Sequence, residues 1–228
     1  MDINGIQKLT LLDFPGHCAC TVFLAGCNLR CPFCHNSSLV LEKGECVMTE
    51  EKFFSFLSTR EGLLDGVCIT GGEPLLRKDI KEFIRKIKDA GFKAKLDTNG
   101  FFPDVLEEIL AEGLVSYVAV DIKNSLPEYS RTCGVNVDTD KIKRTVAMLV
   151  SSDIDYEFRT TCVAGYHTEE SIAQAAKLIK GAKRYFLQSF IDSGALIDPS
   201  CTGIDKAGME KLLQAAREYV PQAQLRGV

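Results

Sequence analysis

Three cysteines fall within eight residues of the segment AGCNLRCPFCHN, where Cys27, Cys31 and Cys34 are separated by three residues and then by two. Thiols this close together are typical of a metal site. A structural zinc ion needs four ligands, and the nearest further candidates are His35, which directly follows Cys34, and Cys46, which belongs to no CxxC pair. Iron–sulfur clusters are the other common use of grouped thiolates. A cluster with three protein ligands keeps one iron open, so the count of three predicts a reactive site in which a substrate or cofactor supplies the missing ligand.

Short apolar runs alternate with amphipathic stretches along the chain, and these elements must position the cysteine loop. One amphipathic stretch places Ile80, Phe83, Ile84 and Ile87 on one helical face and ends at Gly91. The alternation predicts a parallel α/β sheet with right-handed crossovers, and the pattern does not distinguish an open sheet from a barrel. The strand-like runs cover residues 20–26, 66–70, 93–98, 115–122, 156–163 and 184–190. The helical patterns cover residues 79–91, 138–150, 168–181 and 204–220.

Polar residues follow each of these runs, at the point where a strand would end. TGGEP follows the second run, DTNG closes the third, DIKN closes the fourth, and AGYH follows the fifth. In parallel α/β folds, functional groups gather at the carboxyl ends of the strands. The sequence therefore predicts one shared site at these exits, although any single exit could be polar simply because it meets water.

Composition describes an ordinary globular chain of 228 residues, with 46% hydrophobic residues, 25% charged residues and a net charge of −4. That charge gives no reason to expect nucleic acid, and no apolar run approaches the about 20 residues that span a bilayer. The N-terminus lacks the pattern of a signal peptide, so the cytoplasm is the expected compartment. Ten cysteines in a long, well-patterned chain favour a reduced environment with one metal cluster and buried free thiols over a disulfide framework.

The CxxxCxxC loop after the first strand, followed by GGEP after the second, resembles the radical S-adenosylmethionine superfamily. The resemblance implies a partial (β/α)6 TIM-like barrel with parallel strands, formed as a single domain over residues 1–228. Its core would cover about residues 16–190, with a C-terminal helix and strand in residues 204–228. The resemblance also implies a [4Fe–4S] cluster whose open iron binds S-adenosylmethionine. Reductive cleavage of that cofactor yields methionine and a 5′-deoxyadenosyl radical.

The resemblance carries over to individual residues of this sequence. Cys27, Cys31 and Cys34 match the cluster ligands, and Phe33 matches an aromatic residue that packs near the adenine, a flat π-system. The GGEP segment matches the part that holds the methionine amino group, where glycines allow close backbone approach and oxygens accept from an ammonium. Its members are Gly71, Gly72, Glu73 and Pro74.

The segments DFPG, GCNLRCPFCHN, TGGEP, DTNG, DIK and GVN resemble, over residues 5–190, the activating enzymes of glycyl-radical proteins. In that group Asp121 and Lys123 look like contacts to the ribose and carboxylate ends of the cofactor, His167 lies near a histidine that approaches it, and Arg159 is a plausible charge partner. Each also has a plainer explanation, as a strand cap, a solvated lysine or a helix entry. Three further residues match a polar strand end that lines the site, namely Asp97, Thr98 and Asn99.

Residues 35–70 contain no CxxC pair, so we expect one cluster and no ferredoxin-like insert. Cys18 and Cys20 would share one face of a strand. They could face the core or touch the cluster region, and we expect them in the core. The resemblance favours anaerobic ribonucleoside-triphosphate reductase as the partner, which would lose a glycine Cα hydrogen. A low-potential protein such as flavodoxin would supply the electron.

Three alternatives remain open at this point. The first is a radical S-adenosylmethionine enzyme for a small molecule, such as a deazapurine carboxylate synthase. The second is a non-catalytic zinc module built on Cys27, Cys31 and Cys34. The third is a thiol redox protein that uses Cys18 and Cys20 and needs no iron.

Overall fold

The computed structural model describes residues 1–41, 44–192 and 194–227. Its internal contacts divide the chain into two compact units, each assembled from separate stretches of the sequence. The prediction that the whole chain forms one domain stays a prediction. The first unit contains Met1–Asn28, Ser38–Thr98 and Asp104–Val118, and the second contains Leu29–Ser37, Asn99–Pro103 and Ala119 onward.

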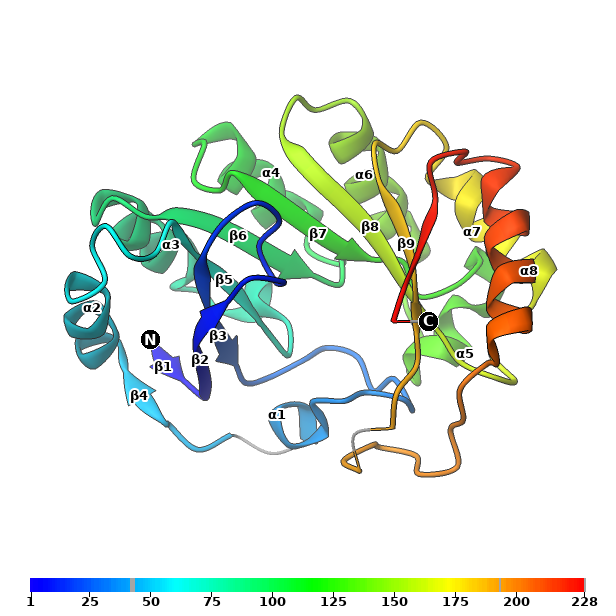
Figure 1. Ribbon diagram of the computed structural model, residues 1–228, viewed down its shortest axis with the longest axis horizontal. Coiled ribbons are helices and arrows are strands. Elements are labelled where there is room, and N and C mark those ends of the chain that lie inside the picture. The colour runs from blue at the N-terminus through cyan, green and yellow to red at the C-terminus, as the bar shows by residue number, and fades with distance from the viewer. Residues whose placement is uncertain (42–43, 193, 228) are drawn as a thin grey trace. The chain divides into compact units, whose positions relative to one another are not determined.

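The first unit is built on four neighbouring strands in the order β2–β3–β5–β6 (Figure 1). Strand β2 runs antiparallel to β3, whereas β3, β5 and β6 pair in parallel, with Val67 opposite both Cys20 and Ala94. A short antiparallel pair, β1 with β4, lies outside this sheet. These strands are β1 (Asp2–Ile3), β2 (Gly5–Thr10), β3 (Ala19–Leu24), β4 (Met48–Thr49), β5 (Gly66–Gly71) and β6 (Lys93–Thr98).

Helix α3 (Ile80–Asp89) shows why this unit folds as the sequence pattern predicts. All four apolar positions of its stripe are buried, and they supply the face that packs against the sheet. Its C-cap is Ala90, and Gly91 follows with a φ of 87°, a backbone region that favours glycine. The other helices that begin or lie in this unit are α1 (Ser37–Leu41), α2 (Glu50–Ser58), the 3-10 turn η1 (Pro74–Leu76) and α4 (Pro103–Ala111).

The second unit carries the strand order β7–β8–β9–β10, in which β8, β9 and β10 pair in parallel. Strand β7 begins in the first unit and ends in the second. Helices α7 and α8 lie side by side along this part of the chain (Figure 1). The strands are β7 (Tyr117–Asp121), β8 (Asp155–Cys162), β9 (Tyr185–Ser189) and β10 (Gln224–Arg226). The helices are the 3-10 turn η2 (Leu126–Glu128), α5 (Tyr129–Cys133), α6 (Thr139–Val150), α7 (Glu169–Leu178) and α8 (Lys206–Arg217).

The α/β class with parallel strands is confirmed, and each of the six predicted runs forms a strand within a few residues of its expected limits. The predicted cap of α7 is also confirmed, because Thr168 and Ser171 form a reciprocal capping box. The predicted C-terminal strand is β10, which pairs with β9. Edge strand β2 was not expected, because its polar residues Gln7 and Lys8 lack a strand-like pattern.

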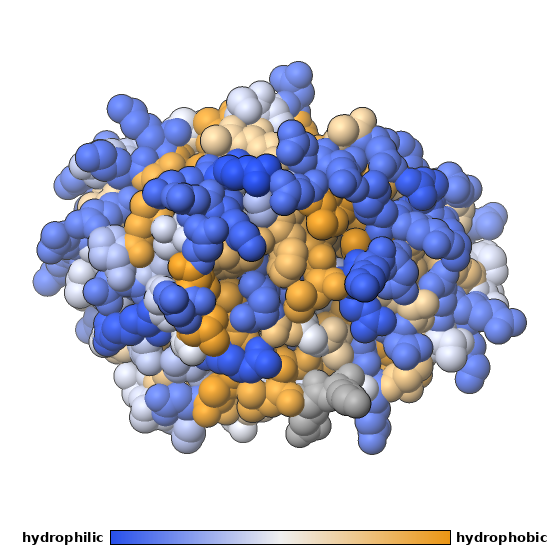
Figure 2. Space-filling model, turned by 180° about the vertical axis from the view of Figure 1, so that it is seen from behind, coloured by the Kyte–Doolittle hydropathy of each residue, from blue (hydrophilic) through white to orange (hydrophobic). Residues whose placement is uncertain are grey.

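The surface combines charged side chains with exposed hydrophobic ones, as the blue and orange areas of Figure 2 show. Leu11 and Leu12, in the turn after β2, are 71% and 88% exposed. Among the described residues, no helix has the length and apolar character needed to cross a membrane.

Candidate active site

The cysteine loop leaves β3 in the first unit and continues into the second, so the predicted site residues divide between the two units. Cys27, the GGEP segment, Asp97 and Thr98 belong to the first unit. The second unit contains Cys31, Phe33, Cys34, Asn99, Asp121, Lys123, Arg159 and His167.

In the second unit, the cysteine loop is fixed to the end of helix α5. The Arg30 N–H donates to the Cys133 carbonyl at 2.9 Å. Gly134 follows with a φ of 67°, and a Cβ at this position would lie 2.1 Å from the Arg30 carbonyl oxygen. Only glycine permits this approach. The Cys34 N–H donates to the Cys31 carbonyl at 3.0 Å, which makes a tight turn between two of the three thiols.

Cys31 is the thiol that this arrangement favours as a thiolate. It is 7% exposed and shares a hydrogen bond with the Cys133 side chain. That hydrogen bond, reinforced by the nearby Lys123 ammonium, outweighs the effect of burial and lowers the pKa of Cys31 to about 7. Burial raises the pKa of Cys34 instead. Cys31 therefore loses its proton more readily than an ordinary thiol, whereas Cys34 loses its proton less readily.

In the first unit, the GGEP segment packs against the backbone that leads into the cysteine loop. The Gly72 N–H donates to the Leu24 carbonyl at 2.8 Å, and the Glu73 N–H donates to the Gly26 carbonyl at 2.7 Å. A Cβ on Gly72 would lie 2.0 Å from the Gly26 oxygen, and one on Gly71 would lie 2.4 Å from Leu24 backbone atoms. The structure shows that both glycines are needed for close packing against the exit of β3, and their predicted approach to the cofactor stays a prediction.

Glu73 is fully buried, and its carboxylate accepts hydrogen bonds from neighbouring residues of the first unit. Its carboxylate accepts from the Leu75 N–H at 3.0 Å, which caps η1, and from the Thr98 hydroxyl at 2.8 Å. These bonds tie the end of β5 to the end of β6. In the second unit, the Asn99 side chain accepts from the Phe101 N–H at 3.1 Å and is also buried. Contacts of these residues with a cofactor stay a prediction.

Asp97 has a partner that sequence reasoning missed. Lys95, two residues earlier on β6, is 1% exposed and forms an ion pair with the Asp97 carboxylate. The Cys68 sulfur lies 3.8 Å from both charged groups, and the Lys95 ammonium lies 5.7 Å from the centre of the Tyr117 ring. Residues two apart on a strand share a face, so a KxD pattern inside a buried strand was the available signal.

Asp121, Lys123 and Arg159 form one charged group in the second unit. The Asp121 carboxylate lies 3.1 Å from the Lys123 ammonium and 3.0 Å from the Arg159 Nε. Arg159 thus forms an ion pair with Asp121, and its predicted part in the cofactor site stays a prediction. Burial alone would raise the pKa of Asp121, but the two cations outweigh it and hold this pKa well below its usual range. Asp121 thus remains an anion that can orient cations and accept hydrogen bonds.

His167 braces this group through both of its ring nitrogens. Nδ1 accepts from the Val163 N–H at 3.0 Å, and Nε2 lies 2.9 Å from the Lys123 carbonyl oxygen. This pattern fits the neutral ring with its proton on Nε2, and burial lowers the pKa of His167. The Phe33 ring lies 6.2 Å from the His167 ring and 5.8 Å from the Tyr166 ring. Because both ring nitrogens of His167 already bond to backbone groups, its predicted contact with a cofactor would be made by the face of the ring.

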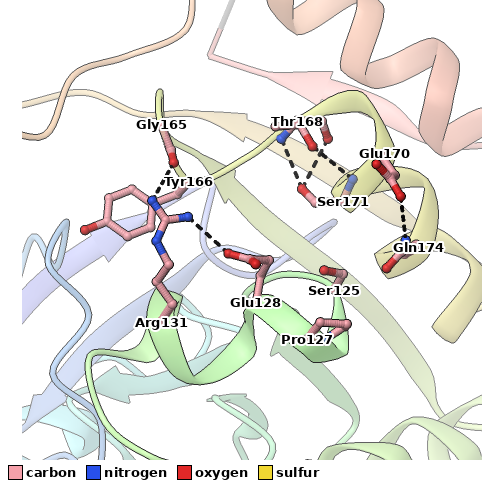
Figure 3. A pocket seen from close by; sticks show the side chains of 10 residues that line it. All are labelled: Ser125, Pro127, Glu128, Arg131, Gly165, Tyr166, Thr168, Glu170, Ser171 and Gln174. Carbon is pink, nitrogen blue, oxygen red and sulfur yellow. Dashed lines mark hydrogen bonds and ion pairs between the residues drawn. The ribbon is translucent and has the colours of Figure 1, made fainter.

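Tyr166 also lines a cavity of about 440 Å³ (Figure 3). Its wall includes Arg131, whose guanidinium lies 4.9 Å from the Tyr166 ring centre and donates to the Gly165 carbonyl at 2.8 Å. Arg131 also donates to Glu128 at 3.0 Å, and Gln174 donates to Glu170 at 3.2 Å. The cavity wall is mainly polar. Its residue Tyr166 also contacts the Phe33 ring.

Comparisons with known proteins decide the family. Residues 21–179 match the model of the radical SAM superfamily. The chain belongs to this superfamily. A Methanocaldococcus jannaschii protein provisionally named a glycyl-radical enzyme activating enzyme is 35% identical over 195 residues, covering 82% of this radical SAM chain and 79% of that protein. The pyruvate formate-lyase-activating enzyme of Clostridium pasteurianum is 32% identical over 127 residues, covering 54% of this chain and 52% of that enzyme.

Solved structures show the same fold. A domain of pyruvate-formate lyase-activating enzyme from Bacteroides vulgatus matches this radical SAM protein with a TM-score of 0.59 and 18% identity, covering 71% of this chain and 99% of that one. Streptococcus suis SuiB bound to S-adenosylmethionine matches with a TM-score of 0.69 and 15% identity, covering 91% of this chain and 52% of that one. The cofactors of the superfamily are a [4Fe–4S] cluster and S-adenosylmethionine.

The donor set of this radical SAM protein fits such a cluster. Cys27, Cys31 and Cys34 supply three sulfur donors from one loop, and thiolates are the ligands that iron–sulfur clusters use. Within the described ranges, no three Cys, His, Asp or Glu side chains are close enough together to hold one metal ion. Each thiolate of a cluster binds a different iron, so convergence on a single point is not required.

Cys18 and Cys20 do not both lie in the core. Cys20 is fully buried on β3, and burial raises its pKa to about 12. Cys18 precedes the strand, is half-buried and donates its N–H to Asp65 at 2.8 Å. The core prediction is therefore confirmed for Cys20 and wrong for Cys18, because β3 begins one residue after Cys18 and leaves it at the sheet margin.

Proposed function

We propose that this radical SAM enzyme activates a glycyl-radical protein by removing a hydrogen from a glycine Cα of that partner. The observation that carries this proposal is the 35% identity to the provisionally named activating enzyme of M. jannaschii, which extends over about four fifths of both chains. The pyruvate formate-lyase-activating enzyme of C. pasteurianum supports the same assignment over a shorter region. The specific partner that we propose is anaerobic ribonucleoside-triphosphate reductase.

Cys27, Cys31 and Cys34 are the proposed ligands of the cluster. A cluster held there would supply the electron for reductive cleavage of S-adenosylmethionine, the chemistry needed to remove the glycine hydrogen. Thiolate ligands must be deprotonated to bind iron. The hydrogen bond from Cys133 and the charge of Lys123 prepare Cys31 for that state.

The protein holds S-adenosylmethionine through groups whose positions are fixed by their neighbours. Phe33 offers an aromatic edge or face to the adenine beside the buried His167 ring. Asp121 is a permanent anion for hydroxyl or ammonium groups, and Lys123 is a permanent cation for a carboxylate. The GGEP segment offers backbone oxygens and the Glu73 carboxylate for the methionine ammonium. Asp97 and Thr98 at the end of β6, with Asn99 directly after it, are further proposed contacts.

A protein substrate also needs a contact surface on this chain. The exposed hydrophobic neighbours Leu11 and Leu12 are the candidate contact residues that we propose. SuiB, which has the same fold, has been solved with its precursor peptide bound. A low-potential flavodoxin is the proposed electron donor.

A second candidate is a radical SAM enzyme for a small molecule. The 7-carboxy-7-deazaguanine synthase of Methanospirillum hungatei is 29% identical over 156 residues, covering 67% of this chain and 62% of that enzyme. This alternative predicts turnover of a purine-like substrate with no protein partner present.

Anaerobic reconstitution with iron and sulfide, followed by reduction and addition of S-adenosylmethionine, tests the radical chemistry. We expect 5′-deoxyadenosine from the native chain and none from Cys31→Ala. Cys162→Ala is the matched control, because Cys162 is also a buried thiol but lies outside the loop. Adding the reductase distinguishes the two candidates, since only the first predicts a radical on that protein.

A further inference from the structure

A row of alternating charges crosses the strands of the second unit and ends at the cofactor group proposed above. It runs from Arg226 at the end of β10, through Glu157 and Arg159 on β8, to Asp121 at the end of β7 and then Lys123. Glu157 and Arg159 are two residues apart, so they share one face of β8. The row contains three cations and two carboxylates.

Arg226 reaches Glu157 across the intervening strand. Its guanidinium carbon lies 3.3 Å from the centre of the Phe186 ring on β9, and its two terminal nitrogens donate to the two Glu157 oxygens at 2.9 and 2.8 Å. This two-pronged geometry is the strongest form of an arginine–carboxylate pair. The Glu157 side chain is only 2% exposed, so water does not compensate its charge.

Arg159 lies between two carboxylates and has to divide its contacts between them. Its Nε is 3.0 Å from Asp121, while its terminal nitrogen is 4.0 Å from Glu157. Because Arg226 already satisfies both Glu157 oxygens, Glu157 exerts a weaker pull on Arg159. Without Arg226, the buried Glu157 charge would draw the Arg159 guanidinium toward itself and away from Asp121.

We propose that Arg226 is a positioning residue: by pairing with Glu157, which would otherwise compete for Arg159, it keeps Arg159 on Asp121 and so sets the affinity for S-adenosylmethionine. This inference rests on the proposed function, since it takes Asp121 and Lys123 as contacts to that cofactor. It assigns the C-terminal strand a part in the cofactor site, although neither residue touches the cofactor.

The test measures the dissociation constant of S-adenosylmethionine for the reconstituted enzyme by anaerobic calorimetry. We expect Arg226→Met to weaken binding about tenfold, a coupling typical of neighbouring charges. Glu157→Gln alone should leave binding close to native, because it removes the competitor for Arg159. The double variant Glu157→Gln with Arg226→Met should recover near-native affinity.

This recovery separates a positioning role from a structural one. If Arg226 only packed β10 against the sheet, the double variant would bind no better than Arg226→Met, and that result would overturn the inference. Unchanged affinity in Arg226→Met would also overturn it. Iron content and melting temperature, measured for every variant, identify a loss of folding.

Arg184→Met is the matched control. Arg184 pairs with Asp155 at 3.0 Å where β8 and β9 begin, and both side chains are largely exposed. Binding should be unchanged in this variant. Failure of the native enzyme to bind S-adenosylmethionine would instead contradict the proposed function itself, so the two failures are distinguishable.

Discussion

Cys133 shares a hydrogen bond with Cys31, the only buried thiol of the three in the cysteine loop. The contact joins the loop to the end of α5, where the Arg30 N–H also bonds to the Cys133 carbonyl. A thiol that hydrogen-bonds a sulfur stabilises its anion, so Cys133 favours the state in which Cys31 can bind iron.

Removing that hydrogen bond should raise the pKa of Cys31 from about 7 toward the ordinary thiol value, because the Cys133 contact is the largest cause of its lowering. In the metal-free protein, we expect the midpoint of Cys31 alkylation to move to higher pH in Cys133→Ala. Mass spectrometry of alkylated peptides across a pH series measures this. An unchanged midpoint would show that Cys133 does not act on Cys31. Cys162→Ala serves as the control.

Gly72→Ala should destabilise the protein severely. The added Cβ would lie 2.0 Å from the Gly26 oxygen, which is backbone and cannot move without displacing the entry to the cysteine loop. We expect a loss of more than about 3 kcal/mol in the free energy of unfolding, at the upper end of overpacking effects. Urea denaturation measures it. Gly91→Ala is the comparison, because Gly91 has a positive φ but open space around it, and it should lose only about 1 kcal/mol.

Asp97→Asn should be more harmful than removal of the whole pair. This variant leaves the buried Lys95 ammonium without its carboxylate, which costs about 3–5 kcal/mol for a buried ion pair. The double variant Lys95→Met with Asp97→Asn should recover much of that stability. Urea denaturation of the three proteins gives the comparison, and equal losses in the single and double variants would contradict this account.

His167 should make stability depend on pH in the weakly acidic range. Burial lowers its pKa, so the unfolded chain binds the proton more readily than the folded one. Stability contributed by the neutral ring is fully present above the ordinary histidine pKa of about 6.5 and declines as pH falls below it. His167→Asn, which keeps an acceptor near Nδ1, should flatten this slope. Melting temperatures between pH 5 and 8 test it, and a slope in His167→Asn as steep as that of the native protein would contradict this account.

Local patterns carried most of what the sequence could predict. Cys27, Cys31 and Cys34 lie within one loop, and Ile80, Phe83 and their neighbours repeat with helical spacing, so both signals are readable over a few residues. Arg159 was a plausible charge partner from the family resemblance alone, and only the fold shows that it pairs with Asp121, 38 residues earlier in the chain. For the cysteine loop and the helical stripe, the physical constraint acts between residues that are close in sequence.

The unpredicted parts depend on contacts between distant segments. Glu157 and Arg226 are 69 residues apart, and no local pattern shows that a C-terminal arginine crosses β9 to reach β8. Cys133 is a single cysteine in a helix, and only the fold brings it to Cys31. The exposure of Cys18 depends on where β3 begins, a limit that an apolar run does not fix within one residue.

The most direct test of the central claim is electron paramagnetic resonance of the partner protein. The reconstituted enzyme, reduced flavodoxin and S-adenosylmethionine would be incubated anaerobically with anaerobic ribonucleoside-triphosphate reductase from the same organism. The account predicts a glycyl-radical doublet on the reductase, dependent on S-adenosylmethionine and absent with Cys31→Ala. Formation of 5′-deoxyadenosine with no radical on the reductase would contradict the proposed partner, and the absence of both would contradict the proposed chemistry.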